Sequence, residues 1–281
     1  MIGEQRDVRV GDRRLRVHDT GPVDGTQEHG SVVWQTGSPQ TGALLAPVVD
    51  AAAERGLRVV SYGRPGYGSS TRQPGRTVAD AAADVDAIAD ALGIDRFFAV
   101  GASGGGPHSL ATAALLGDRV AGAATLAGVA PYVDEGDRFA GMQAPGGLRA
   151  AREGLAAREA FAETDEFDPE SFIDVDYETL RGAWSVLGDD AGRAGAEGPD
   201  GLVDDDVAFA SDWGFDVRSI DVPVLVVQGE LDRVVPASHG RWLFDACGTE
   251  LWMRPGDGHI AILRTLPAVF DWLVARQRAG S

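Results

Sequence analysis

The sequence predicts an α/β fold: a mostly parallel twisted sheet of about eight strands with helices on both faces and an inserted helical cap. Three observations predict this fold. Apolar runs of strand length alternate with stretches of helix length. The inner strand candidates are apolar throughout, which is typical of parallel strands covered on both faces. One long acidic segment, residues 132–218, then interrupts the alternation.

The first half of the chain alternates regularly between strands and helices. Short strands are predicted at 8–10 and 15–18, followed by buried strands at 31–35, 57–62 and 97–100. A first helix ends near Arg55. A second helix spans 77–92, with Thr77 at its start, Gly93 at its end and apolar residues along one face.

The second half repeats the alternation around the acidic segment. Strands are predicted at 120–131, 222–229 and 250–254, and helices at about 236–246 and 260–276. Because a structureless loop of this length would be unusual, residues 132–218 are expected to form two to four helices. This divides the chain into a core of 1–131 and 219–281 and a helical cap of 132–218.

Composition excludes several classes of partner. The 281-residue chain carries a formal net charge of −18, which argues against binding to nucleic acid or an anionic membrane. It contains no apolar run long enough to span a bilayer, and the charged N-terminus is not a secretory signal. The single cysteine, Cys247, fits a reducing cytoplasm. We therefore expect a cytoplasmic protein with a small-molecule substrate; its oligomeric state stays open, a homodimer among the options.

A glycine-rich turn, "GASGGG" at 101–106, follows the strand at 97–100 and precedes a helix. Such a turn can bind phosphate or present a nucleophile. The phosphate alternative is weak because the chain has no lysine, which a P-loop requires. The dinucleotide pattern G-x-G-x-x-G also fails, since its third position is Ser103. Gly101, Ser103 and Gly105 instead meet G-x-S-x-G, the pattern of a nucleophile elbow.

A serine nucleophile needs a base and an acid that orients it. Among five histidines, His259 lies in a glycine-rich loop after the last strand, at the same sheet edge as Ser103. His108 follows Ser103 on a helix and is expected to point away. Asp232 comes directly after the preceding strand and is the favoured acid; Glu230 and Asp257 are nearby rivals.

Three segments, "GASGGG", "GELDRVVP" and "GDGH", resemble the serine, acid and histidine segments of the α/β-hydrolase fold superfamily with a helical cap. The resemblance covers essentially the whole chain. It implies that Ser103 is the nucleophile, His259 the general base and then acid, and Asp232 the orienting carboxylate. "TGSP" at 36–39 occupies the place of the family's oxyanion loop. The resemblance therefore implies that the backbone N–H groups of Ser38 and Gly104 bind the oxyanion.

The sequence departs from the family pattern at three positions. Thr36 stands where the family often has histidine, Ala102 where it often has a bulky residue, and Gly63 where aspartate is frequent. These changes predict a different pocket shape. Five residues are predicted to bind the substrate. Two are the changed residues beside the elbow, and three are aromatic residues of the segment 132–218: Thr36, Ala102, Tyr132, Trp184 and Trp213.

The favoured function is a serine hydrolase that cleaves a small or medium organic ester, lactone or related acyl substrate. A lyase, cyclase or acyltransferase of secondary metabolism, an aminopeptidase that holds an amine with cap carboxylates, and a non-catalytic binding protein remain alternatives. We expect no metal and no cofactor, because the isolated histidines and one cysteine form no ligand cluster. The acidic runs Asp134–Asp137 and Asp204–Asp206 are expected to be solvated faces.

Overall fold

One eight-stranded sheet organises the protein. The computed structural model describes residues 3–23, 30–132 and 137–279. In these ranges the strands lie side by side in the order β1-β2-β4-β3-β5-β6-β7-β8. Their bounds are β1 (Glu4–Val10), β2 (Arg13–Asp19), β3 (Ser31–Gln35), β4 (Arg58–Tyr62), β5 (Phe97–Ala102), β6 (Val120–Leu126), β7 (Val224–Gly229) and β8 (Glu250–Arg254).

The sheet is mostly parallel, which confirms the prediction. β1 and β2 form an antiparallel hairpin, and β2 also pairs antiparallel with β4. From β4 to β8 every neighbouring pair is parallel. β3, β4, β5 and β7 are buried along their whole length, so the continuous apolar runs of the sequence correspond to strands covered on both faces.

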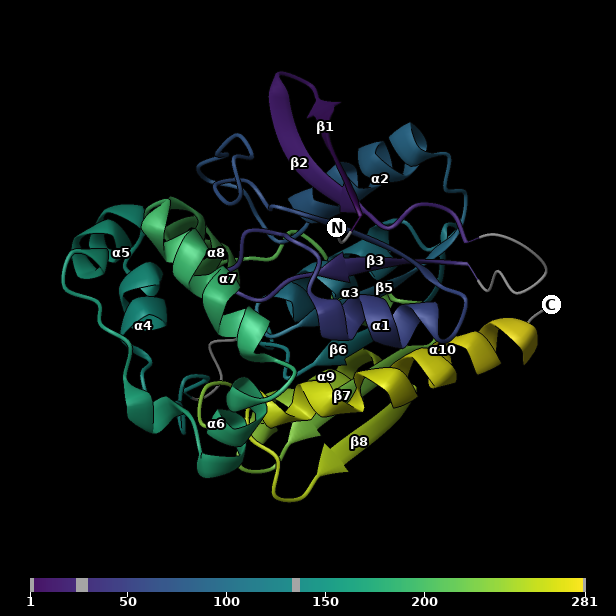
Figure 1. The fold of residues 1–281 in the computed structure, drawn as a ribbon. Coiled ribbons are helices and arrows are strands. Elements are labelled where there is room, and N and C mark those ends of the chain that lie inside the picture. The colour runs from purple at the N-terminus through teal and green to yellow at the C-terminus, as the bar shows by residue number, and fades with distance from the viewer. Residues whose placement is uncertain (1–2, 24–29, 133–136, 280–281) are drawn as a thin grey trace.

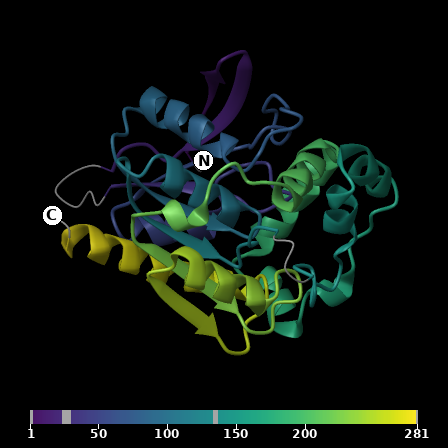
Figure 2. The same ribbon diagram turned by 180° about the vertical axis from the view of Figure 1, so that it is seen from behind.

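Helices cover both faces of the sheet (Figures 1 and 2). α1 (Ala46–Ala53) and α10 (Leu266–Ala279) pack on one face, and α2 (Asp80–Leu92), α3 (Gly105–Leu115) and α9 (Ala237–Cys247) pack on the other. Each face contributes its own hydrophobic cluster: Val32, Val59 and Phe270 belong to one, and Val33, Val60 and Leu110 to the other. Successive strand residues thus alternate between the two layers.

Five helices stand between β6 and β7 in the described part of the chain, and we call them the inserted helices. They are α4 (Gly146–Arg152), α5 (Leu155–Ala162), α6 (Asp174–Arg181), α7 (Ser185–Ala196) and α8 (Asp200–Ala210). They gather beyond one end of the sheet, where the parallel strands point (Figure 1). Two to four were predicted. The difference arises because the helices are short; Gly154, at φ 108°, separates α4 from α5.

Two predicted helix starts were wrong. α2 begins at Asp80 rather than Thr77, because the Asp80 carboxylate accepts hydrogen bonds from the backbone N–H and hydroxyl of Thr77 and turns the chain before the helix. The last helix is preceded by a separate 3₁₀ turn at Ala261–Thr265. None of the described helices combines the length and apolar character that crossing a membrane requires.

Candidate active site

Ser103 occupies a sharp turn between β5 and α3. Its backbone φ of 52° lies in the left-handed region, which non-glycine residues rarely adopt. Strand and helix pass so closely that a Cβ at Gly101 would lie 2.1 Å from the carbonyl oxygen of Gly105. Small residues are therefore required on both sides of the serine, and the turn presents its hydroxyl at the carboxyl edge of the sheet.

The structure brings Ser103, His259 and Asp232 into one hydrogen-bonded row. His259 Nε2 lies 2.9 Å from Ser103 Oγ, and His259 Nδ1 lies 2.8 Å from Asp232 Oδ2. The other Asp232 oxygen accepts the backbone N–H groups of Val234 and Val235. Among the rivals for the acid position, Glu230 is exposed, while Asp257 bonds instead to Arg264 at 2.8 Å.

The charge of Asp232 determines the protonation of His259. Burial by itself lowers the pKa of the imidazole, but the adjacent Asp232 carboxylate outweighs burial and raises the pKa above its ordinary value. Because Asp232 accepts from Nδ1, the Nε2 atom facing Ser103 is left as the acceptor in the neutral ring. The row can therefore take a proton from the serine hydroxyl and stabilise the resulting imidazolium.

A carboxylate of the inserted helices fixes the loop that carries His259. Asp176, buried on α6, accepts hydrogen bonds from the backbone N–H groups of His259, Ile260 and Ala261 at 3.2, 2.8 and 2.8 Å. Sequence reasoning missed Asp176. It lies 83 residues before His259, and its only local signal was a place in the first turn of a helix.

The loop at 36–39 lies directly against the serine. A Cβ at Gly37 would be 3.5 Å from Ser103 Cβ, and a Cβ at Gly104 would be 3.2 Å from Cζ of Phe209, a residue of α8. Within the described residues, the backbone N–H groups of Ser38 and Gly104 donate to no protein acceptor. Two backbone donors without a protein acceptor in the described chain thus lie in the segments next to Ser103.

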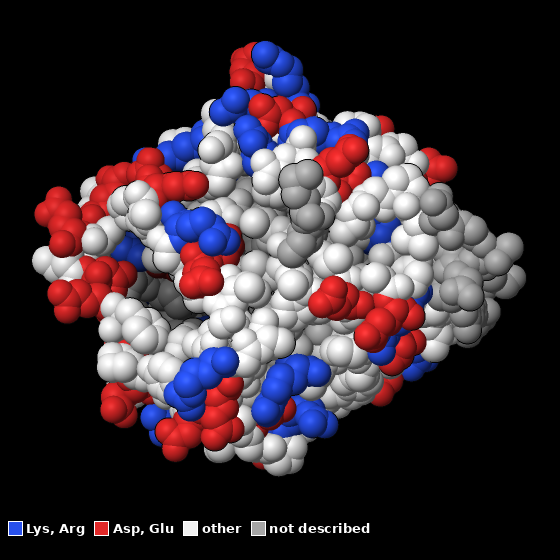
Figure 3. Space-filling model, viewed as in Figure 1, with Lys and Arg blue, Asp and Glu red and all other residues white. Residues whose placement is uncertain are grey.

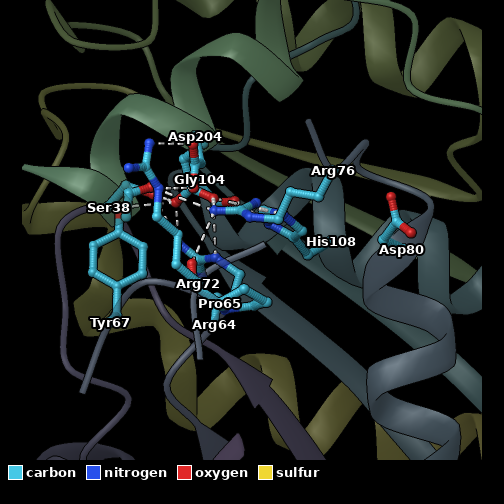
Figure 4. Close-up of polar contacts among 12 residues, drawn as sticks. Ser38, Arg64, Pro65, Tyr67, Arg72, Arg76, Asp80, Gly104, His108 and Asp204 are labelled. Carbon is cyan, nitrogen blue, oxygen red and sulfur yellow. Dashed lines mark hydrogen bonds and ion pairs between the residues drawn. The ribbon is translucent and has the colours of Figure 1, made fainter. Parts of the chain in front are cut away.

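A buried cluster of charged side chains lies behind this loop. Figure 4 shows Arg64, Arg76 and His108 converging beside Ser38 and Gly104. Both guanidinium groups contact Asp205 of α8, at 2.6 and 2.7 Å. His108 faces this cluster: its Nδ1 lies 2.8 Å from the carbonyl oxygen of Gly104, one turn earlier on the helix, and its Nε2 lies 3.9 Å from Asp205.

The expectation of a solvated acidic face at Asp204–Asp206 was wrong. Asp204 and Asp205 are buried, and all three carboxylates pair with arginines: Asp204 with Arg72, Asp205 with Arg64 and Arg76, and Asp206 with Arg158. The arginine partners lie far away in the sequence, so three consecutive aspartates without a nearby basic residue were interpreted as exposed to solvent. In the other acidic run, Asp137 is exposed as expected, and Asp134 lies outside the described residues.

The structure places two of the five predicted substrate-binding residues at the elbow and the other three in hydrophobic or aromatic contacts. Thr36 and Ala102 adjoin the elbow and are buried. Tyr132 packs against Phe139, Trp184 joins the hydrophobic cluster that α1 and α10 share with the sheet, and Trp213 packs in a cluster with Val78 and Phe209. Figure 3 shows the surface hollowed among the inserted helices, with acidic side chains on their outer side.

Comparison with known proteins agrees with this architecture. A family model described as alpha/beta hydrolase fold matches residues 30–264. The structure resembles an esterase from Thermogutta terrifontis, with 20% identity, 98% of this chain and 100% of that chain covered, and a TM-score of 0.73. It also resembles an enol-lactonase from Burkholderia xenovorans, with 24% identity, coverage of 97% and 100%, and a TM-score of 0.70. A bromoperoxidase from Bacillus anthracis aligns at 21% identity, with coverage of 97% and 98% and a TM-score of 0.67.

Proposed function

Since the chain belongs to the alpha/beta hydrolase fold family, we propose that it is a serine hydrolase that cleaves a small or medium organic ester, lactone or related acyl substrate. The observation that carries the proposal is the row formed by Ser103, His259 and Asp232, with hydrogen bonds of 2.9 and 2.8 Å. A nucleophile, a base and an orienting acid in this geometry are what acyl transfer requires.

The reaction proceeds in two halves. His259 Nε2 accepts the proton as Ser103 Oγ attacks the carbonyl carbon, and the resulting oxyanion is bound by the N–H groups of Ser38 and Gly104. The imidazolium then donates its proton to the leaving oxygen, which leaves an acyl-serine. In the second half His259 activates a water molecule that releases the acid. Asp232 keeps Nδ1 protonated and stabilises the charged ring throughout.

We further propose that residues 132–218 act as a cap that shapes the acyl pocket, on a core formed by 1–131 and 219–281. The position of Phe209 supports this role, because its ring would be 3.2 Å from a Cβ at Gly104, one of the two oxyanion donors. An apolar ring at this distance favours an uncharged acyl group.

The arrangement of carboxylates disfavours an aminopeptidase. Such an enzyme needs a cap carboxylate that is free to bind the substrate amine. In the described part of the inserted helices, the buried aspartates all have protein partners: Asp176 with backbone N–H groups, Asp190 with Thr41, Asp204 with Arg72 and Asp205 with Arg64 and Arg76.

Covalent labelling tests the proposal. After incubation with a fluorophosphonate, intact-protein mass is expected to show one adduct on the wild type and none on Ser103→Ala or His259→Ala. Ser109→Ala, which removes a buried hydroxyl from α3, the helix that follows Ser103, is the matched control and should be labelled. Acid release from chromogenic esters and lactones should fall at least about 10³-fold in Ser103→Ala.

The outcomes separate the alternatives. Labelling with acid release supports hydrolysis, whereas labelling without acid release from any ester or lactone indicates a lyase, cyclase or acyltransferase. A folded wild type that takes no adduct contradicts the proposal and indicates a binding protein.

A further inference from the structure

Arg64 is a fully buried arginine that contacts the proposed oxyanion loop. It follows β4 in the turn "GRPG" and is 1% exposed. Its guanidinium donates to the carbonyl oxygen of Thr36 at 2.5 Å, to that of Gly37 at 3.2 Å and to the hydroxyl of Ser38 at 2.8 Å. One side chain thus binds three consecutive residues of the loop.

The contact to Gly37 determines where the N–H of Ser38 points. The Gly37 carbonyl and the Ser38 N–H belong to one planar trans peptide, so the two bonds point in opposite directions. Because Arg64 holds the carbonyl, the N–H is directed away from Arg64. The neighbouring peptide is fixed as well, since the N–H of Gly37 donates to Gln40 Oε1 at 2.6 Å. The Gly37–Ser38 peptide therefore cannot rotate by half a turn without breaking buried hydrogen bonds.

Asp205 of α8 fixes the other side of Arg64. Its Oδ2 atom lies 2.6 Å from the guanidinium and also accepts hydrogen bonds from the hydroxyls of Tyr67, at 3.0 Å, and Ser38. Arg64 therefore cannot retract from the loop without leaving a buried carboxylate short of a partner.

The cluster carries a net positive charge behind the loop. Burial alone would raise the pKa of Asp205, but Arg64 and Arg76 hold it well below its ordinary value. Burial and the adjacent Arg64 lower the pKa of His108 to about 3, so this ring is neutral at pH 7. Two guanidinium groups then face one carboxylate, and the excess charge favours an anion on the far side of the Gly37–Ser38 peptide.

We propose that Arg64, held by Asp205, is the positioning residue of the oxyanion hole: it orients the Gly37–Ser38 peptide and supplies positive charge behind it. The inference rests on the proposed function. Arg64 acts on the tetrahedral intermediate through the loop, so its loss should lower the rate of the chemical steps far more than it weakens substrate binding.

The test compares Arg64→Lys and Arg64→Gln with the wild type on a p-nitrophenyl ester. Lysine keeps the positive charge but lacks the planar guanidinium group, which can donate to several acceptors of the loop at once. We expect kcat to fall about 10-fold to 100-fold in Arg64→Lys and about 10²-fold to 10³-fold in Arg64→Gln, with KM within about 3-fold. The Ki of a trifluoromethyl ketone, whose adduct carries an oxyanion, should rise by a similar factor.

Arg72 supplies the matched control. It bonds Asp204, the residue beside Asp205, with both distances 2.9 Å, and no hydrogen bond to residues 36–38 is among its contacts in the described chain. Arg72→Lys and Arg72→Gln should keep kcat within about 3-fold. Rates are divided by the active-site concentration that fluorophosphonate titrates, because a purely structural defect reduces the number of active sites but not the rate at each one.

If Arg64→Gln does not fold, Arg64→Lys decides the question. Wild-type kcat and Ki per titrated site in a folded Arg64→Lys or Arg64→Gln would overturn the inference. A wild-type chain that neither takes the fluorophosphonate nor releases acid would overturn the proposed function instead.

Discussion

The protonation of His259 determines when the Ser103 hydroxyl can lose its proton. Only a neutral ring can act as the base. Burial disfavours the charged ring, yet the Asp232 carboxylate at 2.8 Å raises the pKa of His259 above 6.5. Asp232, with a smaller contribution from the charge of Asp176, therefore sets the acid side of the pH–activity profile under the proposed mechanism.

We expect kcat/KM to fall as the pH drops, with a midpoint above 6.5, the ordinary pKa of histidine. Asp232→Asn removes the negative charge that raises the pKa of His259, while the burial that lowers this pKa remains. The midpoint should therefore move to lower pH. The rate at pH 8 should also fall by about 10³-fold to 10⁴-fold, because the amide favours the wrong tautomer. Initial rates on a chromogenic ester between pH 5 and 9 measure both effects.

Asp257→Asn is the control for this prediction. Asp257 belongs to the same loop as His259 but bonds Arg254 and Arg264, so its neutralisation should leave the midpoint unchanged. An acid limb at the same pH in Asp232→Asn and wild type would show that Asp232 does not determine the protonation of the base.

Residues that follow strands directly could be found from the sequence, and residues defined by long-range pairing could not. Ser103, Asp232 and His259 each stand just after an apolar run, so their meeting at one sheet edge was predictable. Arg64 and Asp205 are 141 positions apart. Nothing within "DDD" at 204–206 indicates which carboxylate is buried, because burial depends on how α8 is rotated against the core.

At the scale of elements, α6 stabilises the loop that carries His259. Asp176 is the acceptor for three backbone N–H groups of that loop and is itself 1% exposed. Because Asp176 and the three residues that donate to it are buried, removal of the carboxylate leaves these donors unsatisfied in the interior. Docking of α6 and the position of His259 are therefore linked.

We expect Asp176→Ala to lower the free energy of unfolding by about 3 kcal/mol or more and to lower kcat/KM as the loop loosens. Asp176→Asn retains one acceptor oxygen, so its free energy of unfolding should fall less than that of Asp176→Ala. Urea denaturation followed by circular dichroism measures the free energy. Asp174→Ala, an exposed residue of the same helix, should cost less than about 1 kcal/mol. Equal losses in the Asp176→Ala and Asp174→Ala variants would refute the anchoring role.

Helices and strands were predicted well where one hydrophobic pattern extends from the first to the last residue of the element. The strands at 31–35 and 250–254 have the predicted bounds, because each apolar run ends at turn residues. The inserted helices were harder to predict, because helices of 7 to 12 residues hold too few turns for a clear periodicity. Their packing against one another and the core, rather than local propensity, determines where they begin and end.

At the scale of the whole molecule, the inserted helices share the hydrophobic core. Phe209 and Ala208 of α8 pack in one cluster with Val78 and Ala111, which belong to the loop before α2 and to α3. Trp184 joins the large cluster that includes α1 and α10. The buried Arg64–Asp205 pair joins the same two parts. Apolar and ionic contacts thus connect the inserted helices with the sheet.

We expect a single cooperative unfolding transition, although the inserted helices interrupt the sheet between β6 and β7. Exposing the inserted helices alone would open Phe209 and Trp184 to water and separate a buried ion pair, so partial unfolding is unfavourable. Calorimetry should give a van't Hoff enthalpy close to the calorimetric one. Two resolved transitions, or tryptophan fluorescence that changes before circular dichroism, would contradict this expectation.

Asp204, Asp205 and Asp206 make α8 sensitive to changes in chain length. Successive residues of a helix point about 100° apart, and here each of the three carboxylates meets different arginines: Arg72, the pair Arg64 and Arg76, and Arg158. Inserting or deleting one residue between 200 and 203 would rotate all three away from their partners at once. Diversification of this enzyme by insertions and deletions is therefore expected in the connection at 163–168, where most side chains are exposed, while α8 changes only by substitution.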